Sequence, residues 1–355
     1  MSSNATAGGL ATTWLAPLVA LLIAAIVGDV LILSFGQAPG EVYRLLIQGT
    51  WANPYGLGQV LYKATTLTFT GLAVALGLRA GLFNIGAEGQ LAAGGFGAAM
   101  AGLLLPAGTP ALLAVPFCLI GAALGGGVVG AVPGVLKAKF GASEVIVTIM
   151  LNFVVLAFLN WIVAAKMHVG ESLHTPPINA GALPRLSDVA PAFHGSAANA
   201  TIILAMVTAL AVGWFLFRTR AGYDLRATGL QPDAAEYGGV SVGRVHFRAL
   251  TMAGALAGLG GVNYVLGYKQ YYEEGFAAGA GFLGIAVALV GRNHPAGVPL
   301  AALLFATISQ GGLAVNAIVP KQMVEVLTAV VIIAVAVTVP EVQRLVGSVR
   351  RKVAA

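Results

Sequence analysis

Long uninterrupted apolar segments are the feature that most limits what this chain can fold into. Hydrophobic residues make up 58% of its 355 residues and charged residues only 9%, whereas soluble domains are about 25% charged. An aqueous fold of this length could not bury so many apolar side chains. Lipid must therefore surround most of the protein, which predicts an all-α bundle of membrane-spanning helices.

About ten segments are apolar enough to cross a bilayer, for which roughly 20 residues are needed. The chain has 48 glycines, which suit helices that approach closely where lipid provides no hydrophobic drive for association. We expect some spans to be short or broken, within a single transmembrane domain over residues 1–355. The predicted spans lie at about 13–35, 62–79, 88–105, 110–136, 143–165, 199–217, 247–268, 280–292, 296–313 and 322–340.

Positive charge sets the expected orientation. The formal net charge is +6, and most lysines and arginines fall in the loops on one side if the chain alternates from an inside N-terminus. Cytoplasmic loops of membrane proteins carry such an excess of Lys and Arg. We therefore predict that both termini are cytoplasmic, and the basic balance needs no nucleic-acid partner.

Two polar breaks interrupt the spans after related sequences. GLAVALGLR at 71–79 is identical at six of nine positions to GIAVALVGR at 284–292, and each is followed by a short polar stretch. Transporters are often built from internal repeats, although segments rich in Gly, Ala, Val and Leu also match by chance. Irregular backbone at membrane depth is tolerated only within protein or beside a wet cavity, so both breaks are candidate sites.

Four polar side chains in these breaks are candidates for the solute pathway, namely Asn84, Glu88, Gln90 and Asn293. A carboxylate within a span is costly and suggests a function, but Glu88 near a helix start could equally cap that turn. Amide side chains both donate and accept hydrogen bonds. Asn84 and Gln90 therefore suit hydroxyl-rich or base-like solutes, or they tie helices together.

Aromatic residues cluster near the outer end of the seventh predicted span. Tyr264 and Tyr268 are four residues apart and share a helix face. They could form part of an interfacial aromatic belt or stack on a sugar or base as the solute enters. No metal site is predicted, because His294 in the second break has no neighbours at metal-ligand spacing, and no catalytic arrangement is found.

The chain lacks a phosphate-binding loop for ATP. None of its seven lysines follows a glycine, so the Gly-x-x-x-x-Gly-Lys-Ser/Thr pattern is absent. Energy for uphill transport would come either from an ion gradient, with Glu88 as the ion site, or from a separate subunit.

The polar loop at 218–248 favours a separate subunit. Pro232 suits the first position of a helix, Asp233 suits its first turn, and Gly238 would end it. Two isolated helical turns are unstable in water. We therefore expect a groove on a cytoplasmic subunit to receive this helix.

Three segments resemble the permease subunits of ATP-binding cassette (ABC) importers for nucleosides and simple sugars. They are GLFNIGAEGQ at 81–90, KAKFGASEVIVTIMLN at 137–152 and GYDLRATGLQPDAAEYGGVSV at 222–242. The group belongs to the larger set that includes ribose and branched-chain amino-acid permeases. The first segment points toward nucleosides. One alternative is an ABC permease for ribose or another simple sugar. A second alternative is an ion-coupled secondary transporter.

The resemblance implies a multi-pass protein of the bacterial inner membrane that moves solute by alternating access. Its expected partners are a cytoplasmic ATPase, a second permease, identical or homologous, and an extracytoplasmic solute-binding protein. ATP would bind the ATPase, so this chain would need no cofactor and would not be an enzyme. The 218–248 loop would carry the coupling helix that enters the ATPase. The expected ATPase contacts are Arg226, Ala227, Gly229, Pro232, Ala234, Ala235, Gly239, Val240 and, from a second segment, Glu144.

Overall fold

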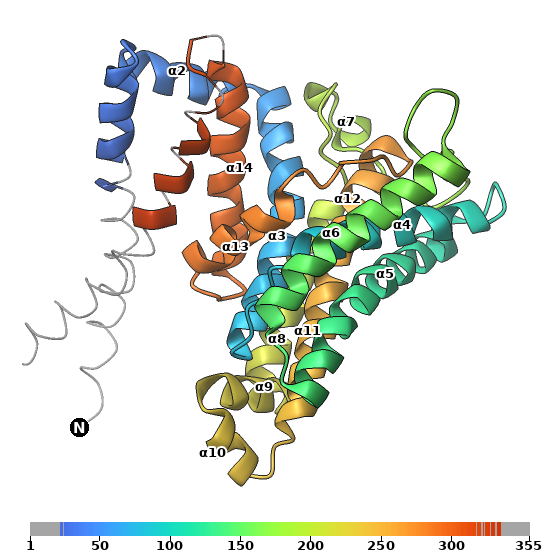
Figure 1. Ribbon diagram of the computed structural model, residues 1–355. Helices are drawn as coiled ribbons and strands as arrows, with labels where there is room; N and C mark the ends of the chain where they lie inside the picture. Colours follow the sequence, from blue (N-terminus) through green and yellow to red (C-terminus); the bar gives the residue numbers. More distant parts are fainter. Residues whose placement is uncertain are drawn as a thin grey trace, which may run out of the picture. The chain divides into compact units, whose positions relative to one another are not determined.

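A computed structural model of the chain contains helices and no β-strand in the part that it describes, which confirms the predicted all-α fold (Figure 1). It describes residues 22–334 apart from positions 24, 317, 321, 323, 327 and 331. The chain divides into two compact units. Residues 57–306 form the larger unit, and residues 1–56 together with 307–355 form the smaller one.

The larger unit combines long and short helices. Among the described residues, six helical segments are long and apolar enough to cross a membrane, and they include α3, α5, α8 and α14. The other two run from α6 through η1 and from α11 through η3. In chain order the helices are α3 (Pro54–Arg79), α4 (Ala87–Leu104), α5 (Ala111–Phe140), α6 (Glu144–Ile162), η1 (Val163–Met167), α7 (Leu186–Val189), η2 (Pro191–Phe193), α8 (Thr201–Arg218), α9 (Arg220–Leu230), α10 (Pro232–Tyr237), α11 (Val242–Gly260), α12 (Val262–Tyr264), η3 (Val265–Lys269), α13 (Ala280–Val290) and α14 (Gly297–Val315).

Several helices begin earlier than hydropathy predicts. The α3 helix begins at Pro54 instead of near residue 62, because the Asn53 side chain accepts a hydrogen bond from the Gly56 amide and caps the first turn. The α11 helix begins at Val242 instead of near residue 247. Polar first turns thus extend the apolar segments that the sequence reveals.

Glycines let α4, α5 and α11 approach backbone to backbone. A Cβ atom added to Gly126 of α5 would overlap the carbonyl oxygen of Gly254 on α11, and one added to Gly254 would overlap that of Gly126. One added to Gly94 of α4 would likewise overlap the backbone of Gly258 on α11. Close packing of this kind holds helices together in lipid, where burial of apolar surface contributes little.

The helices before the two breaks run side by side in the same direction. The Thr70 hydroxyl of α3 donates to the Ala280 carbonyl at the start of α13, at 3.1 Å. At the other end of both helices, Arg79, the last residue of α3, donates to the carbonyl of Asn293, just after α13, at 2.8 Å. This parallel arrangement agrees with the repeat inferred from the two matching nonapeptides, since each helix precedes a break and a further helix.

The smaller unit contains α2 (Pro39–Gly49), an apolar helix at Ala25–Ser34 and the end of α14. Its core consists of Ile32, Val42, Val315 and Val319. The α2 helix is absent from the ten predicted spans because it alternates polar and apolar residues. The predicted spans 13–35 and 322–340 lie partly outside the described residues.

Candidate functional site

The first break, residues 80–86, holds an amide pair in the interior of the protein. The Asn84 amide nitrogen donates to the Gln90 side-chain oxygen at 2.8 Å, and the Gln90 amide nitrogen donates back to Asn84 at 3.1 Å. Both residues are fully buried. The same Asn84 oxygen accepts the Gly86 amide at 3.1 Å, so the pair also closes the turn before α4. In this conformation the pair ties the break together.

Two side chains of α6 complete the hydrogen bonds of this break. The Asn152 side chain accepts the Gly89 amide and donates to the Ile85 carbonyl, both at 2.9 Å. The Thr148 hydroxyl accepts the Ile85 amide at 3.3 Å. Sequence analysis missed both residues, although a lone Asn or Thr in an apolar span is a signal that a buried polar partner exists. Irregular backbone is therefore satisfied by protein at this depth.

Glu88 in the first turn of α4 binds the start of α13. One carboxylate oxygen accepts the Gly279 amide and the other accepts the Gly281 amide, both at 2.7 Å. Both oxygens are therefore satisfied by backbone N–H groups. The positive ends of two helix dipoles, those of α4 and α13, meet this buried charge. The sequence allowed either a cap of its own turn or a pathway residue; in the structure the carboxylate caps the start of α13, and a role in the pathway stays a prediction.

A cavity of about 190 Å³ lies beside Glu88. It is large enough for several water molecules. Among its lining residues are Leu156, Asn160, Tyr272 and Phe276. The buried side-chain oxygen of Asn160 has no hydrogen-bond partner among the described residues. The cavity is therefore lined by both aromatic and polar side chains, and it lies next to a buried carboxylate.

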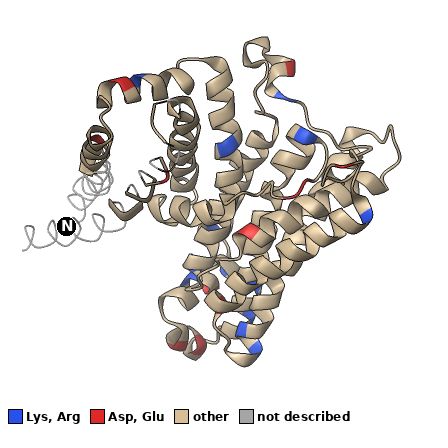
Figure 2. Ribbon diagram, turned by 45° about the horizontal axis from the view of Figure 1, so that its top comes forward, with Lys and Arg blue, Asp and Glu red and all other residues tan. Residues whose placement is uncertain are grey.

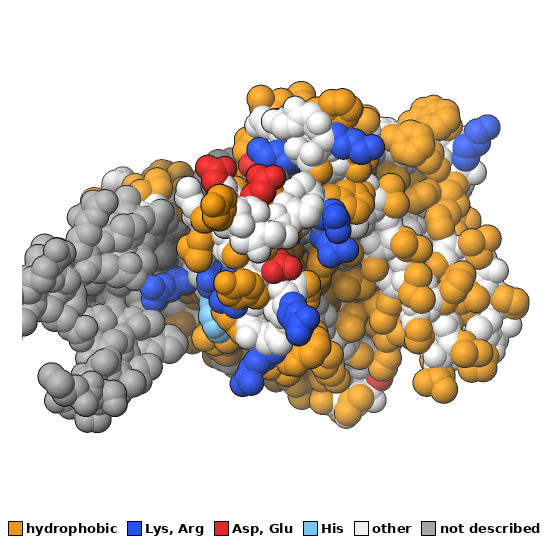
Figure 3. Space-filling view, turned by 90° about the horizontal axis from the view of Figure 1, so that it is seen from below, with side chains coloured by type: hydrophobic (Ala, Val, Ile, Leu, Met, Phe, Trp, Pro, Cys, Tyr) orange, Lys and Arg blue, Asp and Glu red, His pale blue; other side chains and the backbone are white. Residues whose placement is uncertain are grey.

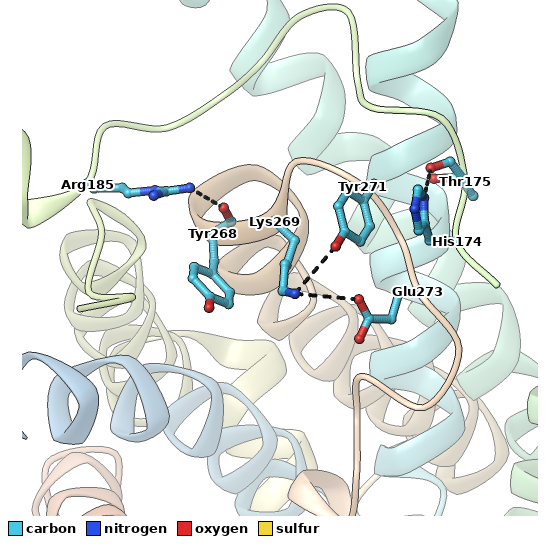
Figure 4. Close-up of polar contacts among 7 residues, drawn as sticks. All are labelled: His174, Thr175, Arg185, Tyr268, Lys269, Tyr271 and Glu273. Carbon is cyan, nitrogen blue, oxygen red and sulfur yellow. Dashed lines mark hydrogen bonds and ion pairs between the residues drawn. The ribbon is translucent and has the colours of Figure 1, made fainter. Parts of the chain in front are cut away.

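An open hollow of about 540 Å³ lies beyond η3, lined in part by His174, Tyr271 and Glu273. The rings of His174 and Tyr271 stack with centroids 4.3 Å apart (Figure 4). Lys269 lies between the Tyr271 hydroxyl, at 3.4 Å, and the Glu273 carboxylate, at 3.8 Å. Glu274, which also lines this hollow, accepts a 2.8 Å hydrogen bond from Asn160. The linings of the hollow and the cavity are therefore linked.

The two predicted tyrosines lie beside this hollow and contact each other. The rings of Tyr264 and Tyr268 have centroids 6.1 Å apart, and Tyr268 also packs on Tyr62 at 5.5 Å. The guanidinium of Arg185 donates to the Tyr268 carbonyl at 2.7 Å (Figure 4). The Tyr264 hydroxyl is buried and lies near the Glu273 carboxylate. Tyr264 and Tyr268 therefore belong to a cluster of aromatic rings, and their predicted roles, in solute stacking or in an aromatic belt, stay predictions.

The second break, residues 291–296, is joined to the end of α3. Arg79 donates from its Nε to the Asn293 carbonyl at 2.8 Å. Asn293 has a φ of 52°, in the left-handed region that Asn tolerates better than most residues. Its side-chain oxygen is buried and has no partner among the described residues. Asn293 therefore lies at one end of the bundle and is not brought together with Asn84, Glu88 or Gln90.

The predicted coupling loop folds as two helices. The α10 helix runs from Pro232 to Tyr237 and ends at Gly238, as the sequence predicts. The α9 helix before it was not predicted, and the Thr219 side chain caps it by accepting the Gly222 amide at 3.0 Å. Lys and Arg gather at this end of the larger unit (Figure 2). Exposed apolar side chains accompany the charge there.

Only some of the predicted ATPase contacts present their side chains to solvent. Pro232, Ala234 and Gly239 are exposed, whereas Ala235 is buried within the chain. The most exposed apolar side chains here are Leu230, at 85%, and Tyr237, at 98%, and sequence analysis missed both. Ala227, Gly229 and Val240 are partly buried.

Two further predicted contacts bind other parts of this chain. Glu144, the first residue of α6, forms a 2.9 Å ion pair with Lys137 of α5. Gly229 lies so close to the first break that an added Cβ atom would overlap the Arg79 carbonyl. The loop is thus in direct backbone contact with the break that Glu88 follows.

Broken helices in an apolar bundle, together with a helical loop at the basic end, are typical of the membrane-embedded subunit of a transporter. Residues 56–336 match the family described as branched-chain amino acid transport system / permease component. The chain belongs to this family and is a permease subunit of an ABC transporter, in which ATP is hydrolysed by a separate subunit.

Three relatives are similar over most of their length. The nucleoside ABC transporter permease protein NupB of Lactococcus lactis subsp. cremoris is 34% identical, covering 91% of this chain and 90% of its own. The guanosine ABC transporter permease protein NupP of Bacillus subtilis is 35% identical, covering 91% and 92%. The glucose ABC transporter permease protein TsgB13 of Haloferax volcanii is 32% identical, covering 90% and 87%.

Proposed function

We propose that this chain is the permease subunit of an ABC importer for nucleosides. Similarity to nucleoside and guanosine permeases over about nine tenths of both chains carries the proposal. The glucose relative makes a simple-sugar importer the second candidate. A cytoplasmic ATPase, a second permease and an extracytoplasmic solute-binding protein complete the proposed transporter. The basic end that carries α9 and α10 is proposed to face the cytoplasm, and the excess of Lys and Arg in the loops supports a topology in which both termini are cytoplasmic.

The proposed solute route enters at the hollow beyond η3 and continues into the cavity beside Glu88. Tyr264 and Tyr268 offer ring faces for a base or sugar. Asn160 bridges the two spaces and has an unpaired side-chain oxygen that suits a solute hydroxyl or amino group. Asn84 and Gln90 join the route when their pairing opens during alternating access.

Coupling to the ATPase is proposed to use the outer surface of α9 and α10. Leu230 and Tyr237 are large apolar side chains that are almost fully exposed, and buried aromatic anchors dominate the binding energy of many interfaces. Motion of this surface would reach the first break through the close backbone contact between Gly229 and Arg79.

A mild-detergent purification of the tagged chain tests the assembly. The wild type is expected to retain a P-loop ATPase. Tyr237→Asp is expected to reduce its recovery at least tenfold, because losing an interface anchor costs about 2 kcal/mol or more. Val189→Asp, which changes an equally apolar residue that is 79% exposed on α7, should retain the ATPase. Equal recovery with both variants would refute docking at α10.

The substrate is tested on the complete transporter with its solute-binding protein. Nucleosides are expected to stimulate ATP hydrolysis and to be taken up into proteoliposomes, with glucose and ribose ineffective. Stimulation by glucose or ribose without stimulation by nucleosides would assign the second candidate function.

A further inference from the structure

Two arginines from different helices lie over one phenylalanine ring at the basic end of the larger unit. The guanidinium carbon of Arg79, at the end of α3, is 5.8 Å from the ring centroid of Phe217, and that of Arg226 on α9 is 5.2 Å away. Both groups are positively charged, and like charges around one ring repel each other unless an anion compensates them. The ring supplies some compensation through its negative face.

No carboxylate in the described part of the chain pairs with either arginine. The ion pairs found there involve Arg44, Lys137 and Lys269 instead. Arg79 uses its Nε to bind the Asn293 carbonyl. The Nε–H of Arg226 is buried and has no acceptor. A buried charged donor without a partner is costly, which points to an anionic group that the chain itself does not supply.

The position of Phe217 indicates which anion this is. Phe217 is the second-last residue of α8 and ends a stripe of large exposed apolar side chains on that helix. Steps of three or four residues place such side chains on one helical face, and α8 is apolar enough to span a membrane. The two guanidinium groups therefore lie where a lipid-facing surface meets the head-group level. The stripe consists of Ile203, Met206, Leu210, Trp214 and Phe217.

We propose that Arg79, Arg226 and Phe217 form a binding site for the phosphate of an anionic phospholipid. Phosphate oxygens accept charge-assisted hydrogen bonds from arginine, and basic pockets between spans on the cytoplasmic side bind anionic head groups. The acyl chains would cover the apolar stripe of α8. Lys and Arg side chains lie among hydrophobic ones on this face of the protein (Figure 3).

The site would place a lipid against the first break, the second break and the loop that carries α9 and α10. Arg79 belongs to the helix that leads into the first break, and it binds the second break through Asn293. Arg226 belongs to the loop that is proposed to couple to the ATPase. A bound head group would neutralise the repulsion between the arginines and hold these parts together.

The test measures lipid binding to the purified transporter complex by native mass spectrometry and thermal shift. Phosphatidylglycerol is expected to bind and to raise the melting temperature, and phosphatidylcholine of the same chain length is not. Arg226→Gln is expected to weaken phosphatidylglycerol binding about tenfold or more, the effect of losing one charge-assisted hydrogen bond. This variant removes no hydrogen bond described within the chain. Arg220→Gln, an exposed change of equal charge at the start of α9, should leave binding unchanged.

Several results would overturn the assignment. Equal affinity of wild type and Arg226→Gln for phosphatidylglycerol would show that the site does not hold the lipid. Equal stabilisation by inorganic phosphate would assign a free anion instead. Loss of the ATPase from the Arg226→Gln complex, with lipid affinity unchanged, would assign a carboxylate of the partner subunit.

Discussion

Replacing Glu88 with glutamine tests whether this membrane carboxylate is a helix cap. The wild-type carboxylate accepts two backbone hydrogen bonds at the start of α13, each worth about 1.5–3 kcal/mol as a bond to a charged group. Glutamine keeps one acceptor of neutral strength, which costs about 1 kcal/mol. Its amide nitrogen faces the other N–H and leaves that buried donor unpaired, at about 2 kcal/mol. We expect a total loss of about 3 kcal/mol.

The assay measures thermal unfolding of the purified chain in detergent by differential scanning fluorimetry. At about 2 °C per kcal/mol for a chain of this size, Glu88→Gln is expected to lower the melting temperature by about 6 °C. Glu41→Gln, which breaks an exposed ion pair with Arg44, should change it by less than about 1 °C. A Glu88→Gln variant as stable as the wild type, but unable to support transport, would refute the cap and assign the carboxylate to the solute or an ion.

Two other perturbations probe the helix packing and the second break. Gly254→Ala is expected to destabilise the larger unit by about 1–3 kcal/mol, because the new methyl group overlaps the Gly126 carbonyl. Gly40→Ala, which has open space around it, should be neutral by the same melting assay, and equal effects would contradict the packing. Partial burial, aided by the charge of Arg79, lowers the pKa of His294 from its usual 6.5. Protonation therefore favours the unfolded state, so stability should be complete above about pH 6.5 and fall as the pH is lowered. His294→Gln should weaken this dependence but not abolish it, because His246 is also partly buried; an equal pH slope in both proteins would exclude His294 as a source.

The sequence alone predicted the features that depend on neighbouring residues. Apolar runs of about 20 residues revealed the spans, because a helix in lipid must satisfy its own backbone. Pro232 and Gly238 marked the ends of α10 correctly, because both act through local backbone geometry. The two breaks were found because glycines and polar residues interrupt apolar runs, and the family was recognised from three short segments of the chain.

The roles of individual residues in the candidate site depended on contacts between distant parts of the chain. Glu88 could cap its own turn or serve the solute, and only the fold brought it to Gly281, 193 residues away. Nothing in the α10 sequence showed that Ala235 faces inward while Tyr237 faces out. The partners of a side chain depend on how the helices pack. The periodicity of one helix shows which face is apolar, but not which other helix packs against that face.

The charged residues show the same difference between what the sequence predicts and what the tertiary structure decides. Composition showed an excess of basic residues, and their positions in the loops between spans predicted on which side of the membrane they gather. Only the tertiary structure brought Arg79 and Arg226 from two helices to the same ring of Phe217. The energy of charged groups depends on distance and burial, and both are set when the helices pack, not by the order of residues along the chain.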